Sequence, residues 1–274
     1  MNPSSLIGIV TSILLMVLIL AFSADNPQLY LDWPSLAIVL GGTMAATFLS
    51  YPLRDVARIF GLLRTALRDE HMDIQNDIDE LVHIARIWVT GDSHAVEQAL
   101  TEVTNPFLRT GVQLIIDRIP EQDILDLLHW RISRLRTLEA AEAQLFRLMA
   151  NYAPAFGMLG TLVGLINVMG DMGNGDMPGF GRNLAMALMP TLYGILLSNL
   201  LFRPVAVKLE RRTEQRLILM NMVLQGISMM CAKSSPGLMR ETLKSFVANY
   251  EDEIFDGTAR PSDPASPAEP PSRR

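Results

Sequence analysis

Four long apolar segments constrain the fold of this chain more than any other feature. They cover residues 6–22, 34–50, 152–169 and 184–202, and they contain no Asp, Glu, His, Lys or Arg. A helix rises about 1.5 Å per residue, so each segment can cross roughly the 30 Å hydrocarbon core of a bilayer. Four such segments predict four transmembrane helices in an all-α membrane protein.

The first apolar segment is interpreted as half of a transmembrane hairpin and not as a cleaved signal peptide. Residues 1–5 carry no Lys or Arg, whereas a signal peptide begins with a positively charged region. The second apolar segment follows after a short loop at residues 23–33. Two helices joined by a short outer loop are therefore expected in residues 1–50.

The distribution of Lys and Arg predicts the orientation in the membrane. Residues 51–149 contain eleven Arg, and residues 203–274 contain eleven Lys and Arg. The loop at 23–33 has none, and the loop between the last two segments has Arg182 alone. Because cytoplasmic segments carry the excess of basic residues, both long segments and both termini are placed in the cytoplasm.

Helical periodicity continues outside the apolar segments. Leu81, Ile84, Ala85 and Trp88 share one helical face, and similar stripes extend from both of the last two segments into the cytoplasm. The chain is accordingly divided into a first transmembrane hairpin, a cytoplasmic helical domain, a second transmembrane pair, a cytoplasmic helical extension and a disordered Pro/Ser-rich tail. These parts cover residues 1–50, 51–149, 150–203, 204–255 and 256–274.

Composition argues against several classes of function. A net charge of −6 argues against a nucleic-acid partner. The single Cys231 excludes an intrachain disulfide, and the four His residues show no metal-ligand spacing. Neither a phosphate-binding loop nor a nucleophile constellation is present, so the sequence predicts no enzyme, no metal site and no cofactor.

The absence of ionisable side chains limits what the apolar segments can transport alone. An ion path in a membrane normally needs an ionisable group facing an interior cavity. The chain is therefore either no transporter or one that takes a carboxylate from a partner. Thr161 and Thr191 are the polar candidates, since a threonine hydroxyl can ligate a hard cation or bond to its own backbone.

Glycine and proline mark the third and fourth apolar segments. Gly157, Gly160 and Gly164 are expected to let another helix approach closely. Pro154 and Pro204 each remove a backbone hydrogen bond and favour a kink. Membrane helices also tolerate proline, so the sequence leaves open whether these kinks are architectural or mechanical.

Motifs in three of these segments resemble those of the MotA/PomA family of flagellar stator subunits. They are DWPSLAIVLGGT at 32–43, APAFGMLGTLVGL at 153–165, and PTLYGILLSN at 190–199 followed by FRPVAVKL at 202–209. The resemblance covers residues 5–250. The motif at 153–165 is also shared with the distant ExbB/TolQ proteins.

The resemblance implies an assembly and an activity. It implies a pentameric ring around a dimeric MotB/PomB-like partner, which anchors to peptidoglycan and supplies the ion-binding aspartate. It also implies a bacterial inner-membrane location and inward flow of H⁺ or Na⁺ that drives torque on the rotor protein FliG. By the same resemblance Thr161 and Thr191 lie in the ion path, Pro154 and Pro204 are functional prolines, and Asp32 lies near the outer mouth.

Two departures from the family pattern bear on the ion and the rotor. Pro190 stands where sodium-driven members often carry threonine, which leaves the coupling ion open between H⁺ and Na⁺. Val89 and Thr90 stand where the family has a rotor-facing basic pair. Arg86, about one turn earlier, and Glu97 are therefore expected to form the rotor contact, and the driven rotor need not be a standard flagellum.

Two other functions remain as alternatives. An ExbB/TolQ-like ion-driven energiser typically has three spans and an outside N-terminus, and the first hairpin argues against it. A passive membrane scaffold would conduct no ions and would not need Thr161 and Thr191.

Overall fold

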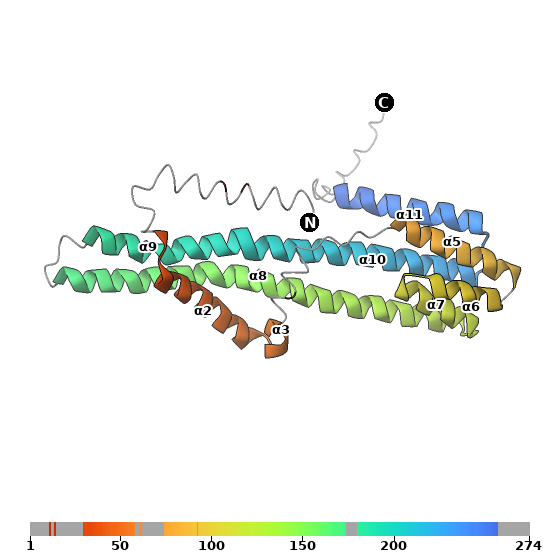
Figure 1. Ribbon diagram of the computed structural model, residues 1–274, viewed down its shortest axis with the longest axis horizontal. Coiled ribbons are helices and arrows are strands. Elements are labelled where there is room, and N and C mark those ends of the chain that lie inside the picture. The colour runs from red at the N-terminus through yellow and green to blue at the C-terminus, as the bar shows by residue number, and fades with distance from the viewer. Residues whose placement is uncertain are drawn as a thin grey trace, which may run out of the picture. The chain divides into compact units, whose positions relative to one another are not determined.

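The computed structural model describes residues 11, 14, 30–57, 61, 74–91, 93–173 and 180–256 (Figure 1). Every element in these residues is helical, which confirms the all-α prediction for this part of the chain. The elements are α2 (Trp33–Ser50), α3 (Leu53–Ala57), α5 (Ile74–Thr90), α6 (Ser93–Glu102), α7 (Pro106–Ile116), α8 (Glu121–Gly173), α9 (Phe180–Leu196), the π-helix η2 (Leu197–Phe202), α10 (Arg203–Cys231) and α11 (Pro236–Asp256).

Three helical stretches of the described residues are long and apolar enough to cross a membrane. They are Trp33–Ser50, Glu121–Gly170 and Asn183–Cys231, and they contain the second, third and fourth apolar segments. The first apolar segment lies outside the described residues, except for helical Thr11 and Leu14. The tail beyond residue 256 lies outside them as well.

The chain forms two compact units, each built from two separate stretches of sequence. Unit 1 combines residues 1–72 with 133–216, and unit 2 combines residues 73–132 with 217–274. Two long helices, α8 and α10, contribute residues to both units.

Large apolar side chains fill the core of unit 2. This unit contains α5, α6, α7, α11, the start of α8 and the end of α10. Its largest fully buried side chains are Ile78, Leu81, Ile84, Leu108, Ile124, Leu128, Met222, Ile227, Met230 and Met239. The predicted stripe on α5 is confirmed, because Leu81, Ile84 and Ala85 are buried together.

Polar caps and proline set the helix boundaries within unit 2. The Asn105 side chain accepts hydrogen bonds from the backbone N–H groups of Phe107 and Leu108, and Pro106 opens α7. Proline suits this position because the first N–H of a helix has no intrahelical acceptor. Pro120 directly precedes Glu121, the first residue of α8.

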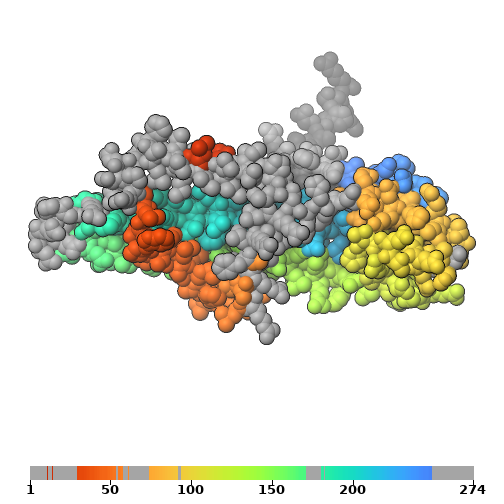
Figure 2. Space-filling model, in the orientation of Figure 1, coloured from red at the N-terminus to blue at the C-terminus, as the bar shows by residue number. Residues whose placement is uncertain are grey.

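Unit 1 has a core in which alanines pack beside larger side chains such as Phe146, and it has a large exposed apolar surface. Its core joins α2, α8, η2 and α10 and includes Ala143, Ala150, Ala153 and Ala206. In the space-filling view, α2 lies across the outside of the other helices of this unit, where it packs against α9 (Figure 2). Large side chains on α8, such as Leu162 and Ile166, are 62% and 70% exposed.

Candidate functional site

Glycines bring the backbones of α8 and α9 into direct contact. A Cβ atom added at Gly157 would lie 2.8 Å from the Pro190 carbonyl oxygen and 3.1 Å from the Thr191 Cα. One added at Gly164 would lie 2.8 Å from the Ala187 Cα. Gly160 faces the Pro190 ring, whose Cβ would be 2.7 Å away. All three glycines therefore line a single seam that no larger residue could occupy without moving α9.

A pair of threonines lies in this seam. The Thr161 and Thr191 hydroxyl oxygens are 2.5 Å apart. The Thr161 hydroxyl also donates to the Gly157 carbonyl at 3.1 Å. Because a hydroxyl has one proton, Thr191 must then donate to Thr161. The Thr191 oxygen keeps its own lone pairs for a water or a cation.

The threonine pair brings oxygen ligands together but no charge. Both side chains are half-buried, and neither apolar segment that supplies them contains a carboxylate. In the part of the chain that the structure describes, no three His, Cys, Asp or Glu side chains come together as a metal site. The pair can orient a water or offer oxygens to a hard cation, but a proton-binding group must come from elsewhere.

Asp32 caps the start of α2. Its side chain accepts hydrogen bonds from the Ser35 backbone N–H at 3.2 Å and from the Ser35 hydroxyl. Its own N–H donates to the Tyr193 hydroxyl at 2.9 Å, and that hydroxyl donates to the Tyr30 carbonyl at 2.6 Å. Tyr193, which sequence reasoning did not single out, therefore fastens the beginning of α2 to α9.

A cavity of about 370 Å³ opens between α2, α8 and α9. Asp32, Gly160 and Gly164 line it together with two asparagines, Asn167 and Asn183. These asparagines were also missed, although Asn167 is a polar residue within an otherwise apolar segment. The cavity places a carboxylate and two amides beside the glycine seam.

The prolines lie inside continuous helical structure. Pro154 is within α8, and Pro190 is within α9. Pro204 is the second residue of α10, and only Arg203 separates it from η2. A π-helix at this point was not predicted from the sequence, and such segments frequently mark functional sites.

Arg86 and Glu97 belong to unit 2, whereas the threonine pair belongs to unit 1. Both side chains are exposed, on α5 and α6 respectively. The helices are joined through Gly91, whose φ of 82° lies in the left-handed region that favours glycine. Glu97 is 3.7 Å from His94.

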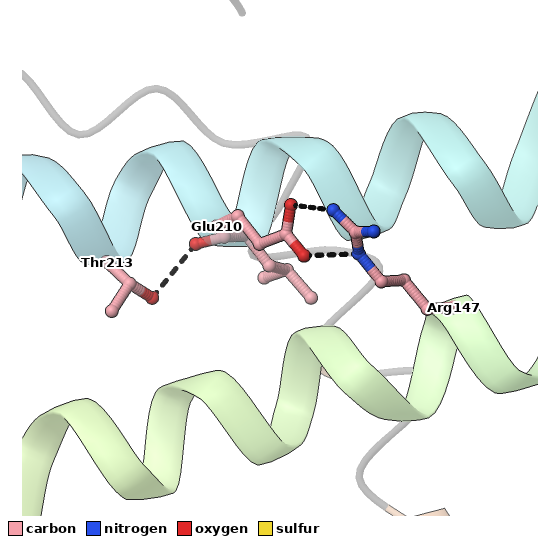
Figure 3. A network of polar contacts seen from close by, with 4 residues as sticks. Arg147, Glu210 and Thr213 are labelled. Atoms are coloured by element: carbon pink, nitrogen blue, oxygen red, sulfur yellow. Dashed lines mark hydrogen bonds and ion pairs between the residues drawn. The ribbon is translucent and has the colours of Figure 1, made fainter. Parts of the chain in front are cut away.

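Two ion pairs connect α8 with α10 inside unit 1. The Arg147 guanidinium donates to both carboxylate oxygens of Glu210, at 2.5 and 2.7 Å (Figure 3). These hydrogen bonds raise the pKa of Arg147 above its usual range. Arg216 pairs with one carboxylate oxygen of Glu139 through its Nη1 atom. Figure 3 also shows Thr213, whose hydroxyl donates to the Leu209 carbonyl of its own helix.

Comparison with known proteins extends the resemblance over nearly the whole chain. The model of the MotA/TolQ/ExbB proton channel family matches residues 99–222. The uncharacterized protein YtxD of Bacillus subtilis is 31% identical over 230 residues, which are 81% of either chain. Motility protein A of Borreliella burgdorferi is 26% identical over 247 residues, covering 90% of this chain and 94% of that one.

A solved structure shows the same fold. A chain in the flagellar MotAB stator complex from Bacillus subtilis superimposes with a TM-score of 0.82 at 22% identity. The superposition covers 91% of this chain and 98% of that one. The described helices therefore adopt a fold already known for a chain of a flagellar MotAB stator complex.

Proposed function

The chain belongs to the MotA/TolQ/ExbB proton channel family, and we propose that it is the stator subunit of an ion-driven rotary motor. The observation that carries this proposal is the near full-length similarity to Motility protein A, which covers 90% of this chain and 94% of the relative. The protein is a channel component and not an enzyme. An inner-membrane location follows from its family and its apolar helices.

The channel is completed by a MotB/PomB-like partner. A solved relative is a MotAB complex, and the apolar segments of this chain provide no carboxylate of their own. The partner brings the acidic group to the seam between α8 and α9. Exposed apolar side chains on α8, including Met158, Leu162 and Ile166, provide a surface that lipid or neighbouring chains must cover.

Within this channel, Thr161 and Thr191 form part of the ion path. Their 2.5 Å contact supports this role because it leaves the Thr191 lone pairs for a transported ion or its water. The coupling ion is H⁺ or Na⁺. Asp32, beside the cavity between α2, α8 and α9, lies toward the outer mouth.

The motor assembles and transmits torque as follows. Five copies form a ring with both termini in the cytoplasm, and the chain crosses the membrane four times. Kinks at Pro154 and Pro204 relay motion from the ion path toward unit 2. Exposed Arg86 and Glu97 then contact the rotor protein FliG through charge pairs, which form and break quickly because each contributes only about 0–1 kcal/mol.

A substitution in the threonine pair tests the proposal. Thr191→Ala should leave the amount of protein in the membrane unchanged and lower ion-driven swimming, because the free oxygen is lost, whereas Thr191→Ser should retain swimming. Thr47→Ala is the matched control, since the Thr47 hydroxyl donates to the Thr43 carbonyl of its own helix. Normal swimming of Thr191→Ala at unchanged expression would remove Thr191 from the ion path.

The same cells identify the ion. Swimming that persists without sodium and stops when a protonophore is added indicates H⁺. Swimming that requires sodium and survives the protonophore indicates Na⁺. A deletion of the gene that leaves swimming and every other ion-driven process unchanged would contradict the motor function itself.

A further inference from the structure

We propose that Ser198 is a positioning residue that replaces, from the neighbouring helix, the backbone hydrogen bond that Pro154 removes from α8. Through this bond the proline turn of α8 and the proline turn at the start of α10 move as one unit. The hydrogen bond itself is independent of the protein's function, whereas its consequence for torque rests on the motor function proposed above.

Pro154 leaves one buried carbonyl of α8 without its normal donor. In an α-helix residue 154 would donate its N–H to the carbonyl of Ala150, and proline has no N–H to give. The Ser198 hydroxyl donates to that same carbonyl at 2.7 Å. Ser198 and Ala150 are each 1% exposed, so water cannot take the place of the missing donor.

This bond differs from the local bonds that three threonine hydroxyls in the helices make. The hydroxyls of Thr47, Thr161 and Thr213 each donate to the carbonyl four residues earlier in their own helix. Such local bonding is the usual behaviour of serine and threonine in helices. Ser198 instead bonds to a residue 48 positions away, at the carbonyl that proline has vacated.

Ser198 also contacts the second proline turn through its backbone. Its carbonyl accepts the N–H of Arg203, which is five residues later and immediately precedes Pro204. This is the hydrogen-bond pattern of a π-helix. The hydroxyl of Ser198 is therefore bound to the Pro154 turn, while its carbonyl is bound to the residue before Pro204.

The close approach of the two helices sets the position of this bond. Gly194, one turn before Ser198, lies against Ala153 and Pro154. A Cβ atom at Gly194 would be 2.6 Å from the Ala153 carbonyl oxygen and 3.1 Å from the Pro154 Cα. Both neighbours are backbone atoms, so α9, which continues into η2, cannot slide along α8 without breaking the contact.

A motor needs such a connection at its kinks. A helix can bend at a proline because one of its backbone hydrogen bonds is missing there. The Ser198 hydroxyl supplies the missing donor from the neighbouring helix. Bending of α8 at Pro154 must therefore either break this hydrogen bond or move η2 as well. Ser198 thus determines whether motion at one proline reaches the other.

A double-mutant cycle in the full chain with its partner tests the hydrogen bond. Ser198→Ala should lower the midpoint of thermal unfolding by about 2–4 °C, the shift expected for one lost hydrogen bond in a chain of this size. In a Pro154→Ala background the loss should be clearly smaller, because residue 154 then donates to Ala150 itself and removal of the hydroxyl no longer leaves that carbonyl without a donor. Should Pro154→Ala not accumulate, Pro154→Gly restores the same N–H group.

Thr213→Val is the matched control, since its buried hydroxyl bonds within its own helix. It should lower the midpoint equally in both backgrounds. Equal losses for Ser198→Ala in both backgrounds would overturn the proposed replacement of the backbone bond.

Swimming tests the positioning role. At unchanged membrane levels, Ser198→Ala should lower swimming speed severalfold, and Ser198→Thr, which keeps the hydroxyl, should restore it. If the loss of thermal stability from Ser198→Ala depends on Pro154 but Ser198→Ala swims normally, the positioning role is overturned while the stator function stays intact. If the wild-type chain drives no rotation, the stator function fails, and the thermal cycle still decides whether the hydrogen bond exists.

Discussion

Leu128 and Gly157 belong to the same helix, α8, yet they hold their surroundings together in different ways. Leu128, in unit 2, is fully buried among large Leu, Ile and Met side chains. Gly157, in unit 1, has no side chain and lies directly against the backbone of α9. On that stretch of α8 the large side chains, such as Leu162, point outward and are exposed.

The difference shows which interaction stabilises each of these two stretches of α8. In water, burying apolar surface stabilises a fold, and large side chains supply that surface. Among lipid tails this force is absent, and helices associate through close contact of small residues. Removing atoms should therefore damage the core of unit 2, while adding atoms should damage the glycine seam of unit 1.

The largest effect on stability is expected in unit 2. Leu128→Ala should destabilise this unit by about 2–5 kcal/mol, because it leaves a cavity in a closely packed core. Leu127→Ala, at a neighbouring side chain that is 42% exposed, is the control and should cost much less. Hydrogen exchange of the α7 amides measures both. Equal losses for the two variants would show that unit 2 has no core of this kind.

A smaller loss is expected when one methyl group is added in unit 1. Gly194→Ala should cost about 1–3 kcal/mol, because the new Cβ meets backbone atoms that cannot move aside. A Cβ atom added at Gly41 would meet no other atom within 4 Å. Gly41→Ala should therefore be neutral or stabilising by up to about 1 kcal/mol, since alanine favours the helix. Thermal unfolding of the purified protein compares them.

Gly111→Ala extends this comparison to unit 2. The added Cβ there would meet the end of the Ile227 side chain, which can rotate away. Its cost should therefore be lower than that of Gly194→Ala. A higher cost would mean that the contrast between the two units is wrong.

The smallest effect on stability is expected at the surface. Arg86→Glu should change the free energy of unfolding by no more than about 0.5 kcal/mol, as is usual for exposed positions. It should nevertheless lower swimming, because it reverses the charge offered to the rotor. Arg131→Glu, an equally simple reversal at an exposed position on α8, is the control. If only the control variant swims poorly, the rotor contact is not on α5 and α6.

Periodicity and motifs predicted much of the fold. Leu81, Ile84 and Ala85 share a helical face that the structure buries, and the glycine spacing indicated close helix contact in the apolar segments. These features depend on residues a few positions apart, which is why sequence alone was sufficient.

Other features depend on which helices meet and in what register. Nothing near Tyr193 in the sequence shows that its hydroxyl bonds to Tyr30 and Asp32, more than 160 positions away. In the sequence, Ser198 cannot be distinguished from any other serine in a helix. Its acceptor in α8 is seen only in the structure, where α8 and η2 lie side by side. The 2.5 Å contact between Thr161 and Thr191 likewise follows from the glycine seam and not from their spacing.

The hydrogen bond from Ser198 to Ala150 also has a consequence for biosynthesis. Ala150 leaves the ribosome 48 residues before Ser198. During that interval the Ala150 carbonyl has neither the N–H of residue 154 nor the serine hydroxyl, and an unsatisfied carbonyl is costly in a medium without water. The Ala150 carbonyl therefore gains a donor only when η2 lies beside α8. A chain whose synthesis stops between residues 154 and 198 would therefore leave the Ala150 carbonyl without this hydrogen bond.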